Sequence, residues 1–182
     1  LEENLSKAKR YLADAGYPGG KGFPELTLLY NTSESHRTIA QVIQQMWNRH
    51  LGIRVQLQNQ EWQTYMLSRR SLDFDVARAG WAGDYADPHN FLNLHLSTGG
   101  NNHTGWGSEE YDRLIRRAAG ETDPEIRFEY YDRAEKILLE EMPLIPIYWY
   151  TRNYLLHPSV KGWHPNLLDR HNYTEVYLEN GE

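Results

Sequence analysis

Hydrophobic side chains recur along this chain with two different spacings. Spacings of three and four residues predict amphipathic helices at 5–15, 34–50, 61–70, 109–119 and 124–141. Short apolar or alternating runs predict strands at 26–30, 53–57, 74–79 and 143–150. Beyond residue 150 the pattern weakens, and Pro, Trp and His are mixed with short strand-like pieces.

Polar residues and glycines mark the ends of these helices. Gly16 suits a left-handed cap, and the stretch NTSES from Asn31 supplies an N-cap for the next helix. Ser108 and Asp123 stand before the last two helices. Asp87 precedes Pro88, which predicts a short helix with Asp87 as its cap.

The first three strands alternate with helices. This order predicts parallel strands joined by right-handed crossovers, and therefore an α/β fold. With the later strand at 143–150, we expect a mixed sheet with flanking helices.

Composition narrows the functional classes. Among 182 residues, 25 acidic and 19 basic side chains give a net charge of −6, which argues against nucleic-acid binding. The absence of cysteine excludes disulfides and thiolate zinc sites, but leaves the compartment open. The His residues form no HExxH or i,i+4 pair, and no cofactor motif is present, so we expect neither metal nor cofactor. Six Trp and 13 Tyr are more than a core of this size needs, and such rings often line ligand clefts.

Polar and aromatic residues follow the predicted parallel strands. The stretches NTSES, NQEW and RAGWAGDYADP come directly after the first, second and third strands. Ligands of open parallel α/β sheets bind beyond the carboxyl ends of the strands. The sequence therefore predicts a ligand crevice at these three loops, with Gly80 and Gly83 allowing close backbone approach.

Each candidate residue in these loops has two interpretations. Asp84 could hold a cation or an ammonium group, or stabilise its own turn. Trp62 and Trp81 could stack on a ligand or belong to the core. Arg69 and Arg78 could pair with a carboxylate. Arg78 shares the strand parity of a mostly buried face, where an arginine needs an anionic partner.

An enzymatic alternative also rests on this loop. Asp84 and Asp87 are two carboxylates in an aromatic setting, as glycosidic acid–base chemistry requires. Their sequence spacing does not fix the distance between the carboxyl groups.

Several motifs occur in an order that is typical of one family. RAGWAGDYADPHNFLN, GWGSEEYDRLI and the stretch from DPEIRFEYYDRAEKILLEE to PLIPIYWY resemble the C-terminal lobe of dipeptide- and oligopeptide-binding proteins of ABC importers, the extracytoplasmic solute-binding proteins of family 5. The resemblance implies that Asp84 meets the α-ammonium of a peptide and that Trp62 lines the pocket. It also implies that Arg69 and Arg78 serve the peptide C-terminus or neighbouring charges, and that Tyr150 lies at the pocket edge. Trp81 would add an apolar wall.

The resemblance further implies a fold of the type II periplasmic-binding-protein kind and a non-catalytic role. Residues 1–182 would form one C-terminal lobe of a two-lobed protein that lacks its N-terminal lobe here, and residues 150–182 would cross back towards that lobe. The implied partners are a peptide and the membrane permease of the importer, and the implied location is periplasmic or extracytoplasmic, with a lipid anchor as one form of attachment. A relative tuned to another solute, such as a cell-wall peptide, an opine, a sugar or a nickel chelate, stays an alternative.

Overall fold

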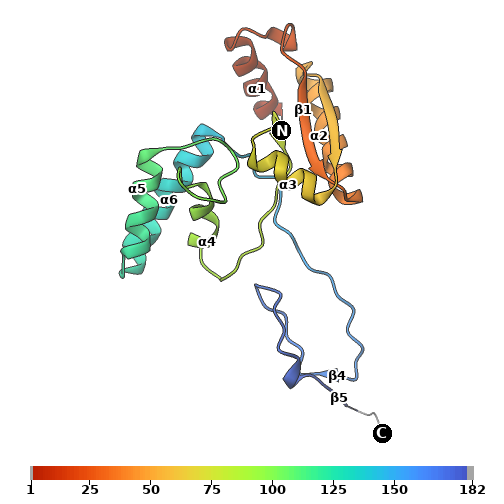
Figure 1. Cartoon of the computed structure of the whole chain (residues 1–182), viewed down its shortest axis with the longest axis vertical. Helices are drawn as coiled ribbons and strands as arrows, with labels where there is room; N and C mark the ends of the chain where they lie inside the picture. The colour runs from red at the N-terminus through yellow and green to blue at the C-terminus, as the bar shows by residue number, and fades with distance from the viewer. Residues whose placement is uncertain (1, 180–182) are drawn as a thin grey trace. The chain divides into compact units, whose positions relative to one another are not determined.

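The computed structural model describes residues 2–179 and divides the chain into two compact units, one up to Gly80 and one from Trp81 onwards (Figure 1). The first unit contains α1 (Glu2–Asp14), β1 (Leu26–Asn31), α2 (Glu34–Leu51), β2 (Val55–Gln60), α3 (Trp62–Arg70) and β3 (Val76–Ala77). The second contains α4 (His89–Leu92), α5 (Glu109–Gly120), α6 (Pro124–Glu141), β4 (Val160–Lys161) and β5 (Tyr177–Leu178).

A parallel sheet of order β2-β1-β3 organises the first unit. β1 pairs with β2 from Leu26–Val55 to Asn31–Gln60, and with β3 at Leu28–Val76. All three strands are parallel, which confirms the prediction from their alternation with helices. Figure 1 shows α2 lying along β1.

β1 is the central strand and is buried on both faces. Leu28 and Tyr30 point to one face, where they form a core with Ala40 of α2. Leu29 points to the opposite face and is also fully buried. Burial on both sides explains why LTLLY reads as a continuous apolar run rather than an alternating one.

The second unit is built on the α5–α6 hairpin. Its core is formed by residues from both helices: Tyr111, Leu114, Ile115, Ala118, Tyr131, Ala134 and Leu138. The two predicted caps are confirmed, because Ser108 accepts a hydrogen bond from the Tyr111 amide and Asp123 accepts from the amides of Glu125 and Ile126. These caps satisfy amide groups that a helix N-terminus leaves without a partner.

Several details of the predicted elements are wrong. No strand forms at 143–150, where the chain is an irregular segment. Pro143 and Pro146 remove two amide donors from this segment, and an apolar run becomes a strand only where a neighbour pairs with it. The third strand is only two residues long. The NTSES stretch does supply the N-cap residue of α2, Ser33, but its hydroxyl contacts Ser35 and makes no capping hydrogen bond.

The chain after α6 carries a short antiparallel pair, β4 with β5, in register Val160–Leu178. Large apolar side chains of this segment lie in solvent: Trp149 is 91% exposed, Leu155 104% and Leu167 86%. Across residues 2–179, no helix combines the length and apolar character that crossing a membrane requires.

Candidate functional site

The carboxyl ends of β1 and β2 are tied together in the first unit. The Thr32 hydroxyl, directly after β1, lies 3.1 Å from both the Gln60 carbonyl and the Asn59 side-chain oxygen. The Thr32 amide also donates to the Gln60 carbonyl at 2.9 Å. The predicted NTSES and NQEW loops therefore start from one fixed edge of the sheet.

The end of β3 brings a positive charge to this unit. The Arg78 amide donates to the Leu29 carbonyl, so the arginine continues the line of β3 and is partly buried. Burial lowers the pKa of His36, and the Arg78 charge lowers it further, against a hydrogen bond with Asn31 that raises it. His36 was not a predicted site residue, and the sequence gives no signal that it approaches Arg78.

Tyr65 connects the three predicted residues of the first unit. Its ring is buried, lies 5.6 Å from the Trp62 ring and packs under the guanidinium of Arg69, also at 5.6 Å. Its hydroxyl donates to the Arg78 carbonyl. Tyr65 was missed because its helical spacing predicts only a core residue, yet it fixes one side of α3 to the end of β3.

Trp62 itself is largely available to a ligand. Its side chain is 56% exposed and borders a hollow of about 540 Å³ with Gln63, Met66, Leu67 and Arg70 of α3. The sequence left open whether Trp62 stacks on a ligand or belongs to the core, and an exposed fraction of 56% does not fit a core residue.

A buried carboxamide shapes residues 81–88, the part of RAGWAGDYADP that belongs to the second unit. The side-chain oxygen of Asn90 accepts from the Trp81 indole at 2.8 Å and from the Asp84 amide at 3.2 Å. Asn90 is only 4% exposed. A Cβ on Gly83 would lie 3.2 Å from the Phe91 ring, so the ring and the loop backbone approach closely at this glycine. The sequence did not single out Asn90.

Asp84 presents its carboxylate outwards. Its side chain is 66% exposed, and its closest charged partner among residues 2–179 is Arg170, at 4.0 Å. Within the described turn the carboxylate accepts no hydrogen bond, so the alternative of a turn-stabilising aspartate does not fit. An outward carboxylate on a loop with a fixed backbone can meet a cation or an ammonium group.

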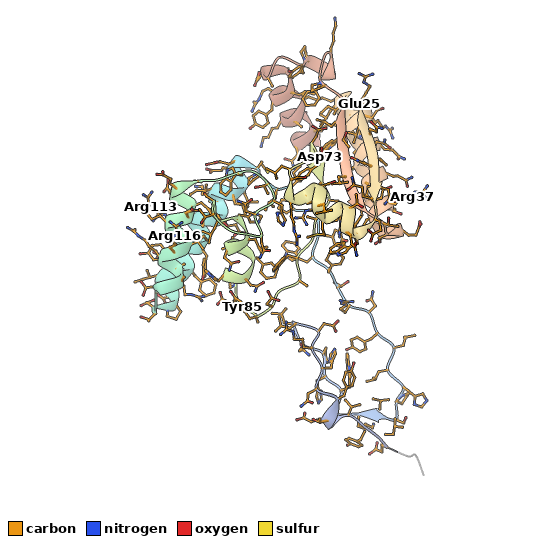
Figure 2. The ribbon with its side chains drawn as sticks, viewed as in Figure 1. Glu25, Arg37, Asp73, Tyr85, Arg113 and Arg116 are labelled. Carbon is orange, nitrogen blue, oxygen red and sulfur yellow. The ribbon has the colours of Figure 1, made fainter. Side chains whose placement is uncertain are left out.

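Asp87 has a different role. One of its oxygens accepts from the His89 amide at 2.8 Å, as a capping aspartate would, although α4 begins at His89 rather than at Pro88 as predicted. Both oxygens also accept from the guanidinium of Arg127, each at 2.8 Å. The hydrogen bonds from Arg127 lower the pKa of Asp87. Figure 2 labels Tyr85 on the same loop.

Tyr150 lies in the irregular segment after α6. Its ring meets that of Tyr148 edge to face at 4.9 Å and is 58% exposed. Among the residues that the structure describes, no three His, Asp or Glu side chains gather as metal ligands would.

The predicted site residues are thus divided between the units. Trp62, Arg69 and Arg78 gather around Tyr65 in the first, and Trp81 and Asp84 gather around Asn90 in the second. A common concave surface for Trp62, Arg78, Trp81 and Asp84 stays a prediction.

Loops at the carboxyl edge of a parallel α/β sheet are where proteins of this architecture bind small ligands. The family model for bacterial extracellular solute-binding proteins, family 5 Middle, matches residues 2–103. The chain belongs to this family.

Similar proteins agree on the class. The periplasmic murein peptide-binding protein MppA of Escherichia coli is 46% identical over 162 residues, which cover 89% of this chain and 30% of MppA. The oligopeptide-binding protein OppA of Bacillus subtilis is 39% identical over 166 residues, 88% of this chain and 30% of OppA. The crystal structure of Haemophilus influenzae OppA in complex with RPPGFSPFR superposes with a TM-score of 0.85 at 35% identity, over 97% of this chain and 35% of that one. The chain therefore spans about a third of the length of these relatives.

Proposed function

We propose that this chain is part of the peptide-binding component of an ABC importer and supplies one wall of its cleft. In the complete protein, Asp84 would bind the α-ammonium of a peptide. Trp81 and Trp62 would form apolar walls, and Tyr150 a pocket edge. Arg69 and Arg78 would serve the peptide C-terminus or neighbouring charges.

The outward carboxylate of Asp84 carries this proposal. Its backbone amide is held by buried Asn90, while its side chain makes no hydrogen bond within the turn and is 66% exposed. The names of the similar proteins MppA and OppA support a peptide as the ligand. A charge-assisted hydrogen bond between a carboxylate and an ammonium is stronger than one between neutral groups.

We also propose that the protein has no hydrolytic activity. The two-carboxylate alternative needs one carboxyl group that stays protonated near neutral pH. Arg127 lowers the pKa of Asp87, and both Asp87 oxygens are already occupied. Asp87 is therefore poorly suited to act as a general acid.

The remaining proposals concern the complete protein. The segment after α6 would pack against a second lobe, which would cover exposed side chains such as Trp149 and Leu155. The protein would be periplasmic or extracytoplasmic, with a lipid anchor as one form of attachment. It would deliver its ligand to the membrane permease of the importer.

Calorimetry on the complete two-lobed protein tests the function. We expect a free peptide to bind and the same peptide, N-acetylated, to bind about 30- to 3000-fold more weakly, because acetylation leaves a desolvated carboxylate unpaired. Equal binding of the two peptides would refute the amine anchor, and failure of any peptide to bind would favour another solute.

A further inference from the structure

We propose that Arg127 of α6 is a positioning residue for the ligand loop, defined as residues 81–88. It does not touch the ligand. A series of hydrogen bonds within the second unit leads from its guanidinium to the backbone of Asp84. The inference rests on the proposed function for its consequence in ligand binding, but the contacts themselves do not depend on that function.

The first contact joins α6 to the end of the ligand loop. Both terminal nitrogens of Arg127 donate to the Asp87 carboxylate, each at 2.8 Å, across 40 residues of sequence. The side chains are 26% and 25% exposed. A two-point arginine–carboxylate pair fixes direction as well as distance, and partial burial reduces its screening by salt.

The second contact passes this constraint to α4. The Asp87 side chain accepts from the His89 amide at 2.8 Å, and the Asp87 carbonyl accepts from the Asn90 amide at 3.1 Å. α4 has only four residues, too few to hold its position by its own hydrogen bonds. Its orientation therefore depends on contacts at both ends: Asp87 holds the N-terminal end, and the Tyr111 hydroxyl donates to the Leu92 carbonyl at the C-terminal end.

The third contact returns from α4 to the ligand loop. Asn90 holds the Trp81 indole and the Asp84 amide through one oxygen. A shift of α4 moves that oxygen and with it both proposed ligand contacts. Asp84 is thus placed by an arginine 43 positions later in the sequence.

The Arg127 end of this series is anchored on a buried core residue. The Arg127 guanidinium lies 4.9 Å from the centre of the Tyr131 ring, which it can bind through a cation–π interaction. Tyr131 is 3% exposed and belongs to the core of the α5–α6 hairpin. The hairpin core therefore serves as the fixed support for the loop.

Hydrogen exchange on the complete protein without ligand tests the positioning. In Arg127→Ala, we expect the amides of residues 81–92 to exchange about tenfold faster, because loss of a charge-assisted hydrogen bond favours local opening. Arg133→Ala is the matched control on the same helix. Arg133 pairs with Glu110 at 3.6 Å with both side chains more than half exposed, so its loss should leave the loop unchanged.

Arg127→Lys separates positioning from folding. Lysine keeps the positive charge but cannot make the two-point contact, so exchange should lie between wild type and Arg127→Ala. Circular dichroism and an unchanged exchange rate in α5, which shares its core with α6, show that the variants are folded. If Arg127→Ala does not fold, Arg127→Lys still gives the comparison with Arg133→Ala.

Ligand binding provides a readout that general destabilisation would not move. The ratio of the Kd values for N-acetylated and free peptide reports how well Asp84 is aimed at the amine. In Arg127→Ala this ratio should fall about tenfold below that of wild type, and in Arg133→Ala it should not change.

The outcomes are distinct. Equal loop exchange in Arg127→Ala and Arg133→Ala overturns the proposal, as does faster exchange with an unchanged Kd ratio. A Kd ratio of one in wild type refutes the amine anchor of the proposed function. The role of Arg127 in holding the loop is then decided by the exchange rates alone.

Discussion

Asn90 is a single buried side chain on which two parts of the ligand loop depend. Replacing it by alanine leaves the Trp81 indole and the Asp84 amide without their shared acceptor. We expect Asn90→Ala to lower the free energy of unfolding by about 1–3 kcal/mol, measured by urea denaturation of the complete protein. Asn101→Ala, at an exposed position, should change it by less than about 0.5 kcal/mol. An equal effect of both variants would contradict the role assigned to Asn90.

The stability of the protein at acid pH tests the contact between Asp87 and Arg127. The pKa of its carboxyl group in the folded protein lies below the ordinary value of 3.8, mainly because of hydrogen bonds from Arg127. A lowered folded pKa stabilises the protein above the unfolded pKa, and this stabilisation is lost as the pH falls through the folded value.

The difference in unfolding free energy between wild type and Asp87→Asn should therefore be constant near neutral pH. It should shrink as the pH falls below 3.8. Denaturation curves at a series of pH values measure this difference. A difference that stays constant to the lowest pH, or widens, would show that Asp87 is not held by Arg127.

Whether the role of a residue could be predicted from the sequence depends on how far away its contact partner lies along the chain. The cap at Asp87 was predictable because its hydrogen-bond partner lies two residues away and Pro88 follows. The pairing of Asp87 with Arg127 was not predictable, because Arg127 lies 40 positions later in the sequence, on a face of α6 that the sequence alone does not distinguish from a solvent-exposed one. Tyr65 and Asn90 were missed for the same reason, as their roles depend on tertiary contacts.

At the scale of elements, the α5–α6 hairpin offers a matched pair of leucines. Leu138 is 5% exposed in the hairpin core, while its neighbour Leu139 is 41% exposed. Leu138→Ala should lower the free energy of unfolding by about 2–5 kcal/mol, because it leaves a cavity between the helices. Leu139→Ala should cost about 1 kcal/mol or less. Thermal and urea denaturation measure both, and equal losses would contradict the packing described.

Helices and strands could be predicted where the hydrophobic pattern within the element is enough to identify it. The helices from Glu34, Glu109 and Pro124 were located from hydrophobic spacing and capping residues, which are local properties. β1 was located because it is buried on both faces. The apolar run at 143–150 has the same appearance in sequence, but no strand pairs with it in residues 2–179. Strand formation depends on a partner, which the run itself cannot reveal.

At the scale of the whole molecule, the segment after α6 makes a prediction about the complete protein. Trp149 and Leu155 are 91% and 104% exposed. Because such a concentration of exposed apolar side chains marks an interface, we expect residues 143–158 to be covered by the rest of the protein.

Hydrogen exchange can compare the 182-residue chain with the complete protein. Amides of residues 143–158 should exchange rapidly in the former and be protected in the latter, while amides within α5 should exchange alike in both. Equal exchange of residues 143–158 in the two proteins would contradict a covering lobe.

The most direct test of the central claim is a four-way calorimetric comparison in the complete protein. Wild type and Asp84→Asn are each titrated with a free and an N-acetylated peptide. If Asp84 binds the peptide amine, either change alone weakens binding by about 30- to 3000-fold, and the second change adds little to the first. The fold should survive Asp84→Asn, since the side chain is 66% exposed. Losses that simply add, or an Asp84→Asn variant that binds the free peptide as tightly as wild type, would contradict the account.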